Sequence, residues 1–235
     1  MKANIDPIKT QKQRAALEAV RHVKDGYIVG LGSGSTAAYA IEAIGKRIEE
    51  ENLHIMGIPT SYQAFLLAVE CKIPITTLDE HPVIDVTIDG ADQLTTELFL
   101  IKGGGAALAR EKIVASASKL NVIIVDDAKK VKLLGEKNQF VPIEVLPFAL
   151  PIVKETIVAM GGRPVVREGK GKLGPTITDN GNAIIDAYFG EIVNPAELAV
   201  KVKMIPGVVE TGFFIGLTDI VYVGTSTEVE RLVKS

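Results

Sequence analysis

Short apolar runs alternate with amphipathic stretches over the first 130 residues of this 235-residue chain. The apolar runs have the length of buried β-strands, and the stretches between them carry apolar residues at helical spacing. The expected strands are Tyr27–Leu31, Leu53–Ile58, Val83–Ile88 and Asn121–Val125, and the expected helices are Ile8–Val23, Thr36–Glu51, Tyr62–Cys71 and Ala106–Lys119. Because strands separated by helices of this length form βαβ units, the pattern predicts an α/β fold, a parallel sheet with helices on both faces.

The pattern changes after residue 130. Pro142, Pro147 and Pro151 punctuate a helical stretch that should end at Gly161–Gly162. The elements expected next are a strand at Arg163–Arg167, a hairpin turn at Asp179–Asn182, a strand at Ala183–Tyr188, and a helix that begins at Pro195 after the N-cap residue Asn194. The final β-rich stretch, Gly207–Val223, is expected to rejoin the first sheet. We therefore predict a main domain of residues 1–130 and 206–235 and a small α+β domain of residues 131–205.

The composition indicates a globular protein that binds a small molecule. Hydrophobic residues make up 47% of the chain, enough for a substantial core, and no apolar run approaches the ~20 residues that span a bilayer. The net charge of −3, the 5% aromatic content and the lack of Trp argue against nucleic acid as a partner. Because Cys71 is the single cysteine and the N-terminus lacks the apolar core of a secretory signal, we expect a cytoplasmic protein with no membrane partner.

Three polar, glycine-containing segments each follow an expected strand. They are Gly30–Thr36, Asp89–Gln93 and Lys102–Ala107. Because the carboxyl ends of parallel strands meet at one edge of a sheet, we expect all three segments to open at that edge, where open α/β folds bind their ligands. Glycines and hydroxyls suit a phosphate, and the charged groups of Asp89, Asp92, Lys102 and Glu111 suit proton transfer. The combination predicts an enzyme that acts on a small phosphorylated molecule.

The first of these segments has two interpretations besides a phosphate site. Gly32–Ala37 matches the fingerprint of dinucleotide-binding folds, but the end of the second strand, Gly57–Ser61, lacks the carboxylate that would hold the ribose of the cofactor. A phosphate bound by backbone N–H groups and by the hydroxyls of Ser33, Ser35 and Thr36 fits better. A tight strand–helix turn without any ligand stays open as an alternative.

The charged residues have structural alternatives as well. Asp89 or Asp92 could cap the next element, and Glu111 could be a solvated surface charge. Three consecutive glycines after Lys102 are entropically costly, so we favour close approach of the backbone to a ligand over a flexible linker. A glutamate one or two turns into the helix that follows could reach back over the strand edges as a general base. The three histidines show no metal-ligand spacing, and no metal is expected.

At the level of whole motifs, the chain closely resembles the type A ribose-5-phosphate isomerases. The matching segments are Gly30–Thr36, Asp89–Asp92, Ile101–Lys112, Gly161–Pro164, Thr178–Asn182 and Ile205–Val208. They extend over essentially the whole chain, and the run from Lys102 to Lys112 is the most specific of them.

The resemblance implies interconversion of D-ribose 5-phosphate and D-ribulose 5-phosphate, with Glu111 as the proton acceptor. Asp89, Asp92 and Lys102 lie in the implied substrate-contacting segments and complete the predicted catalytic set. The other residues implied to contact substrate are Ser33, Gly34, Ser35, Thr36, Gly90, Ala91, Gly103, Gly104, Gly105 and Lys129. The resemblance also implies a Rossmann-like main domain with a small α+β domain, a homodimer or homotetramer, and neither a metal nor an organic cofactor.

Two positions depart from the family pattern. Ser33 stands where many relatives have Thr, which keeps the hydroxyl, and Gln93 stands where the motif often carries Glu, which leaves no formal charge there. Two other functions stay open as alternatives. A sugar-phosphate sensor on the same fold would need the glycine segments but not Glu111 together with Lys102. An acyl-CoA transferase-like enzyme would use a glutamate as its nucleophile.

Overall fold

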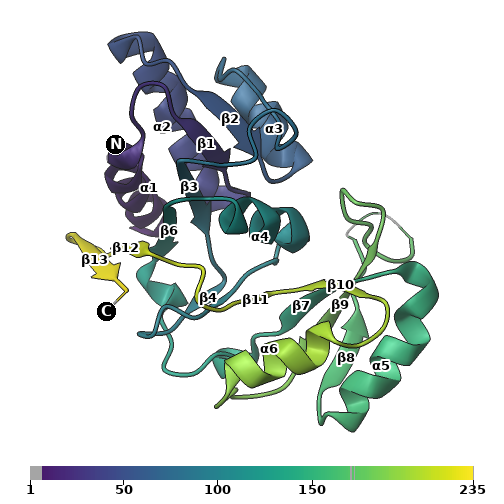
Figure 1. Ribbon diagram of the computed structural model, residues 1–235. Coiled ribbons are helices and arrows are strands. Elements are labelled where there is room, and N and C mark those ends of the chain that lie inside the picture. The colour runs from purple at the N-terminus through teal and green to yellow at the C-terminus, as the bar shows by residue number, and fades with distance from the viewer. Residues whose placement is uncertain (1–6, 170, 172, 235) are drawn as a thin grey trace. The chain divides into compact units, whose positions relative to one another are not determined.

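The computed structural model describes residues 7–169, 171 and 173–234, and these divide into two compact units (Figure 1). The first unit consists of the described parts of residues 1–91, 110–129 and 217–235, and the second unit consists of the described parts of residues 92–109 and 130–216. The second unit thus includes residues 92–109 and 206–216, which the predicted boundaries assigned to the main domain. Their short strands pair with one another and with strands of the second unit.

The first unit is built on a six-stranded sheet of order β13-β12-β6-β3-β1-β2. Its strands are β1 (Ile28–Leu31), β2 (Met56–Pro59), β3 (Val86–Gly90), β6 (Asn121–Asp126), β12 (Ile220–Gly224) and β13 (Val229–Val233). All neighbours pair in parallel except β12 and β13, which are antiparallel. The predicted parallel sheet is confirmed, and the four strands expected in the first 130 residues all belong to it.

Helices cover both faces of this sheet (Figure 1). They are α1 (Pro7–Ala19), α2 (Gly34–Glu51), α3 (Tyr62–Glu70) and α4 (Leu108–Ser116), with the short 3₁₀ helices η1 (Val20–His22) and η2 (Asp127–Lys129). Successive side chains of a strand point to opposite faces of a sheet. Val29 and Leu31 of β1 pack in one core cluster with Ile41 of α2, whereas Ile28 packs with Val114 of α4. The predicted arrangement, with helices on both faces, is therefore present.

The second unit contains two antiparallel sheets. The four-stranded sheet, of order β10-β7-β9-β8, consists of β7 (Val141–Val145), β8 (Arg163–Val166), β9 (Ala183–Tyr188) and β10 (Val208–Thr211). The three-stranded sheet, of order β11-β5-β4, consists of β4 (Gln93–Leu94), β5 (Leu100–Ile101) and β11 (Phe213–Phe214). The helices of this unit are α5 (Leu150–Ala159) and α6 (Pro195–Lys203), with the 3₁₀ helices η3 (Glu136–Asn138) and η4 (Pro147–Ala149).

The two faces of the four-stranded sheet differ in polarity. Ile143 and Ile185 pack with α5 and α6 in one apolar cluster. Because side chains alternate, the neighbouring Glu144 and Asp186 face the other side. There Oε1 of Glu144 accepts hydrogen bonds from the side chains of Thr178, Asn180 and Asn182. These bonds hold the hairpin turn that the sequence predicts ahead of β9.

Two expectations about the path of the chain were wrong. The segment after Lys102 follows β5, which pairs antiparallel with β4 and β11 and is not a strand of the parallel sheet. The chain leaves the parallel sheet after Gly90 and forms a short hairpin before it reaches Lys102. In the stretch Gly207–Val223, β12 alone joins the first sheet, because β10 pairs with β7 and β11 pairs with β5. The structure also adds the strand β7 where the sequence suggested a proline-punctuated helix.

Candidate active site

The candidate site in the first unit lies at the carboxyl ends of β1 and β3. β1 pairs with β2 on one side and with β3 on the other, so the strand order switches direction at β1. In open α/β sheets such a switch point opens a crevice in which ligands bind. Gly32 and Ser33 follow β1 at this point, and Asp89 is the penultimate residue of β3.

Asp89 is tied to the loop that follows β1. The residue is 3% exposed, and its Oδ1 accepts hydrogen bonds from the N–H groups of Ser33 at 3.1 Å and Gly90 at 2.7 Å. A Cβ atom at Gly32 would lie 2.3 Å from Asp89 Oδ1, so this close approach requires glycine. Charge-assisted bonds to two amides fix the orientation of the carboxylate. Asp89 therefore ties the end of β3 to the loop that precedes α2.

The first glycine segment forms the start of α2. Ser33 occupies the N-cap position, but its Oγ is bonded to Thr60 Oγ1 at 2.7 Å and to Ser61 Oγ at 2.6 Å. The N–H of Gly34 donates to Gln63 Oε1 at 2.8 Å. The first turn of α2 contains no acidic residue, and the partial positive charge at a helix N-terminus favours an anion. Ser35 and Thr36 lie in that turn, as the prediction of a phosphate site requires.

Lys12 of α1 also reaches this helix start, which the sequence analysis missed. Its Nζ lies 3.0 Å from Ser35 Oγ. A lysine in an amphipathic helix looks like a solvated surface charge, so the sequence holds no signal for this contact. It arises because α1 packs directly beside α2.

Gly90, Ala91 and Lys129 belong to the same edge of the parallel sheet. Gly90 ends β3 and pairs with Ile124 of β6, and Ala91 follows it. Lys129 is half-buried at the end of η2, directly after β6. Among the described residues, no hydrogen bond or ion pair joins Lys129 to the segment Ser33–Thr36. Lys129 thus lies at the predicted edge of the sheet, but the structure shows no polar contact between its described atoms and the first glycine segment.

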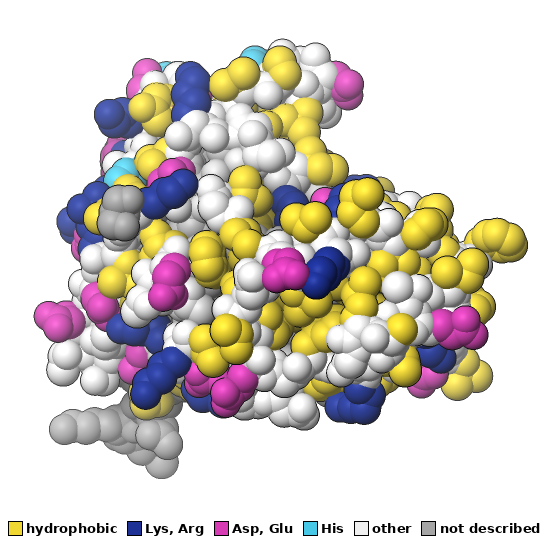
Figure 2. Space-filling view, turned by 60° about the horizontal axis from the view of Figure 1, so that its bottom comes forward, with side chains coloured by type: hydrophobic (Ala, Val, Ile, Leu, Met, Phe, Trp, Pro, Cys, Tyr) yellow, Lys and Arg dark blue, Asp and Glu magenta, His cyan; other side chains and the backbone are white. Residues whose placement is uncertain are grey.

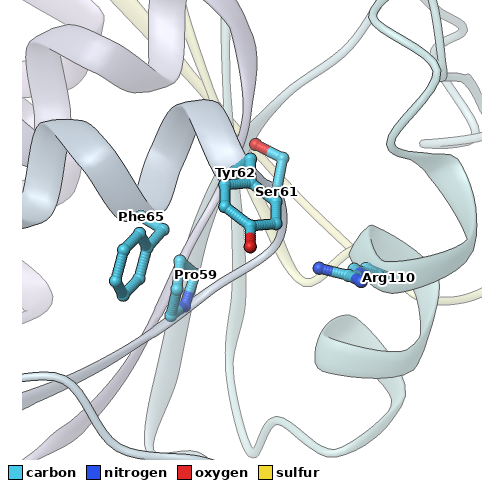
Figure 3. A pocket seen from close by; sticks show the side chains of 5 residues that line it. All are labelled: Pro59, Ser61, Tyr62, Phe65 and Arg110. Carbon is cyan, nitrogen blue, oxygen red and sulfur yellow. The ribbon is translucent and has the colours of Figure 1, made fainter. Parts of the chain in front are cut away.

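A small pocket in the first unit was not foreseen from the sequence (Figure 3). It measures about 160 Å³ and is lined by Pro59, Ser61, Tyr62, Phe65 and Arg110. Figure 3 shows the Arg110 side chain extending from α4 toward Tyr62 and Ser61, while Phe65 and Pro59 supply apolar surface. Its volume is below the roughly 300 Å³ at which small-molecule pockets begin, so it suits a fragment of a ligand.

In the second unit, Asp92 and Lys102 lie next to the two strands of one short hairpin. The N–H of Asp92 donates to Ile101 O at 2.8 Å, and the N–H of Lys102 donates to Gly212 O at 2.9 Å. Lys102 is 3% exposed, and its Nζ lies 5.3 Å from the centroid of the Phe214 ring. A cation over an aromatic face is stabilised by the ring quadrupole, more strongly where water is excluded. The Lys102 side chain is therefore buried against the Phe214 ring of β11.

Asp92 also fixes the glycine segment that follows Lys102. Its Oδ2 accepts a hydrogen bond from the N–H of Gly104 at 2.8 Å. A Cβ atom at Gly104 would lie 2.8 Å from Asp92 Oδ1, and Gly103 has a φ of +102°, so both positions favour glycine. No described atom lies within 4 Å of a Cβ built at Gly105. Asp92 thus holds the glycine segment that directly follows Lys102.

Glu111 lies in the first turn of α4 and is 5% exposed. The alternative that it is a solvated surface charge is therefore wrong. Glutamates are almost never fully buried unless they are paired, because burial of a carboxylate costs free energy. A buried glutamate on the helix that follows a ligand-type glycine segment is a candidate general base.

The predicted catalytic residues are divided between the two units. Asp89 and Glu111 belong to the first unit, and Asp92 and Lys102 belong to the second. Asp89 and Asp92 are three positions apart in the sequence, which limits the distance between their Cα atoms to about 11 Å.

Comparison with known proteins decides the family. The sequence model of the family described as Ribose 5-phosphate isomerase A (phosphoriboisomerase A) matches residues 56–228. The chain belongs to this family. The ribose-5-phosphate isomerase A of Natronomonas pharaonis is 50% identical over 94% of this chain and 96% of its own length. That of Methanothermobacter thermautotrophicus is 49% identical over 92% and 94%, respectively.

Solved structures of ribose 5-phosphate isomerases have the same fold. The ribose 5-phosphate isomerase A of Methanocaldococcus jannaschii superposes with a TM-score of 0.92 at 48% identity, covering 95% of this chain and 98% of that one. A D-ribose-5-phosphate isomerase in complex with phospho-erythronic acid gives 0.94 at 44% identity, covering 96% and 99%. The resemblance found in the sequence motifs and the Rossmann-like fold that it implies are both confirmed.

Gln93 departs from the ribose 5-phosphate isomerase A motif, and the structure explains how the amide is accommodated. Its Nε2 donates to Glu136 O at 2.8 Å, and its Oε1 accepts from the N–H of Gly135 at 2.8 Å. A glutamate could accept from Gly135 but could not donate to Glu136. The amide therefore holds β4 to the turn at residues 135–136 and carries no charge role.

Within residues 7–169, 171 and 173–234, no group of three or more His, Cys, Asp or Glu side chains could hold a metal ion. No helix in that part of this ribose 5-phosphate isomerase A family member is long and apolar enough to cross a membrane.

Proposed function

We propose that this chain interconverts D-ribose 5-phosphate and D-ribulose 5-phosphate in the non-oxidative pentose phosphate pathway. The observation that carries the proposal is that this member of the ribose 5-phosphate isomerase A family has a set of four charged residues suited to proton transfer. This set consists of Asp89, Asp92, Lys102 and Glu111. A related isomerase binds phospho-erythronic acid, which combines a phosphate with a carboxylate at the opposite end of a short polyol chain.

Isomerisation of the open-chain sugar moves a proton from C2 to C1, and we assign this transfer to Glu111. Its carboxylate removes the C2 proton, the electron pair forms a C1–C2 double bond, and negative charge moves onto O1. Glu111 then returns the proton to C1, while the O2 hydroxyl proton passes to O1 and the C2 carbonyl forms. Proton transfer by a positioned group of this kind contributes roughly 10²–10⁴-fold to the rate.

Lys102 is proposed to stabilise the charge that develops on the oxygens of the enediolate. The low exposure of its side chain supports this role, because an ammonium group acts more strongly where water is excluded. A well-placed donor of this type contributes about 3–4 kcal/mol to the transition state. Asp92 holds the N–H of Gly104 and so orients the segment that carries Lys102.

Asp89 is proposed to assist opening of the furanose ring, because it can carry protons between the ring oxygen and the anomeric hydroxyl. Its two backbone hydrogen bonds keep the carboxylate oriented at the switch point of the sheet. A fixed carboxylate that both accepts and returns a proton suits such a step.

The phosphate of the sugar is proposed to bind at the start of α2. Support comes from the amides and hydroxyls of Ser35 and Thr36 and from the ammonium group of Lys12, which lies beside Ser35. Lys129, on the same sheet edge, is proposed as a further phosphate ligand. Binding energy from the phosphate end would position C1 and C2 for proton transfer.

We further propose that the protein is a cytoplasmic homodimer or homotetramer that needs no metal or organic cofactor. Figure 2 shows many hydrophobic side chains (yellow) at the surface. In the second unit, the side chains of Phe148, Val193 and Met204 are 96%, 83% and 76% exposed. Association of copies would remove such side chains from water, and this supports an oligomer.

Incubation with ribose 5-phosphate alone separates the isomerase from the other functions considered. We expect a ketopentose phosphate to form without any second substrate, at a rate that EDTA leaves unchanged. D-Ribose is the matched control, and we expect it to react far more slowly because it lacks the phosphate that positions the sugar. Binding of ribose 5-phosphate without ketopentose formation would favour the sensor, and a requirement for an acyl-CoA would favour the transferase.

A further inference from the structure

Arg167 contacts the glycine segment of the second unit through the backbone. It follows β8, and its Nε and one terminal nitrogen bond both carboxylate oxygens of Asp186 in β9. The other terminal nitrogen donates to the carbonyl oxygens of Gly103 and Gly104, each at 3.0 Å. The guanidinium also lies 5.2 Å from the ring centroid of Phe140. One side chain thus joins the four-stranded sheet to the segment after Lys102.

These contacts hold one peptide group from both sides. The Gly103–Gly104 peptide presents its C=O to Arg167 and its N–H to Asp92 Oδ2, at 2.8 Å. In a trans peptide the C=O and the following N–H point in opposite directions. Because Arg167 also holds the carbonyl of Gly104, the N–H of Gly105 is turned away from Arg167 as well. Because Asp92 engages the N–H of Gly104, the N–H of Gly105 is the amide of this pair that is oriented for an anionic oxygen.

Arginine suits this task because of its geometry. Its rigid, planar guanidinium presents several donors at once. It can therefore pair with Asp186 and, at the same time, donate to two carbonyl oxygens. Asp186 is 8% exposed and offsets the charge of Arg167. Three consecutive glycines have more backbone freedom than any other tripeptide, so a fixed conformation needs such an external hold.

We propose that Arg167 is a positioning residue of the isomerase. It orients the backbone of Gly103–Gly105 so that the N–H of Gly105 and the Lys102 side chain keep the arrangement that the enediolate requires. Asp186 in turn fixes Arg167. This inference rests on the proposed function, in which the segment from Lys102 to Gly105 contacts the substrate.

The first test is Arg167→Lys. Lysine keeps the positive charge but cannot donate to Asp186 and to the carbonyl oxygens of Gly103 and Gly104 at the same time. We expect kcat for ribose 5-phosphate to fall roughly 10²-fold, the scale known for a misplaced catalytic group. We expect a smaller change in KM, because the phosphate is held by other residues. Arg163→Lys is the matched control, since Arg163 also stacks on an aromatic ring, that of Tyr188 at 4.0 Å. Its kcat should equal that of the wild type.

The second test separates positioning from folding. Replacement of Arg167 alone by an apolar residue would leave Asp186 buried without its counter-ion, so the double variant Arg167→Met/Asp186→Asn removes both charges. We expect a thermal midpoint near that of the wild type, a low kcat and weaker binding of phospho-erythronic acid. Inorganic phosphate, as a competing ligand of the phosphate site, should inhibit it as it does the wild type.

The outcomes are distinct for the two proposals. Wild-type kcat in either folded variant would overturn the positioning role. A loss of kcat that only matches the loss of folded protein, measured by circular dichroism, would overturn it too. Failure of the wild-type protein itself to isomerise ribose 5-phosphate would instead refute the proposed function.

Discussion

Three consecutive glycines follow Lys102, and each is favoured by a different circumstance. Gly103 has a φ of +102°, a conformation that other residues adopt at a cost. Gly104 leaves room for Asp92, whose Oδ1 would lie 2.8 Å from an added Cβ. At Gly105 neither reason applies. This glycine has no positive φ, and apart from its two neighbours in the chain no described atom would lie within 4 Å of an added Cβ. We propose that glycine at position 105 allows close approach of the substrate.

We therefore expect Gly105→Ala to lower kcat/KM for ribose 5-phosphate without a change in the thermal midpoint. Gly103→Ala should instead destabilise the protein by about 1–3 kcal/mol, because alanine is strained at that φ. Thermal unfolding and steady-state kinetics of the two variants check this. Normal kinetics for Gly105→Ala would show that the backbone at this position does not approach the substrate.

The sequence predicted those candidate site residues that neighbouring residues in the chain mark as unusual. Asp89 and Lys102 could be singled out because charged groups next to glycines after apolar strands are unusual, and Glu111 because its helix starts at a glycine segment. Lys12 and Arg167 could not, because their contacts lie 23 and 64 positions away in the sequence. Such partners become neighbours only when helices and sheets pack, and a single sequence does not report that packing.

Elements with local end signals were predictable, and elements stabilised by distant pairing were not. The helix α6 begins at Pro195, as expected, with Asn194 Oδ1 accepting from the N–H of Glu197. The strand β7 was missed because it contains Pro142, and proline is unusual inside a sheet. Pro142 is tolerated because its carbonyl oxygen still accepts from the N–H of Gly212, while the carbonyl oxygen of Gly212 accepts from the N–H of Lys102 and needs no donor from Pro142.

At the scale of the element, Asn194→Ala should destabilise the second unit by about 1 kcal/mol, since the first turn of α6 loses its cap. Asn194→Ser is the control, because a serine hydroxyl can cap the same amide. Both variants should keep wild-type turnover per folded molecule, as α6 carries no proposed catalytic residue. Urea unfolding measures the effect, and equal stabilities of the alanine and serine variants would contradict it.

Across the first unit, His22 connects segments from the two ends of the chain. Its Nε2 lies 2.9 Å from the Tyr222 hydroxyl, which links η1 to β12. Burial lowers the pKa of His22 below its usual 6.5, and the positive charges of Arg231 and Lys24 lower this pKa further. The folded protein therefore favours neutral His22. The unfolded chain binds the proton at higher pH, so protonation favours unfolding.

The sign of this linkage gives a pH prediction for the whole molecule. The contribution of His22 to stability is fully present above pH 6.5 and is lost as the pH falls from 6.5 through the lower pKa of the folded state. His22→Gln keeps a polar partner for Tyr222 but does not titrate. Its thermal midpoint should fall less than that of the wild type between neutral and mildly acidic pH. Equal slopes for the two proteins would contradict the prediction.

The central claim for the molecule as a whole is that a buried glutamate moves the proton of a bound sugar phosphate. The most direct measurement is turnover of ribose 5-phosphate by Glu111→Gln, with Glu155→Gln on the exposed surface of α5 as the control. We expect Glu111→Gln to lose at least roughly 10²-fold in kcat while it still binds phospho-erythronic acid, because the amide keeps the shape but cannot accept the proton. Turnover near that of the wild type would contradict the claim.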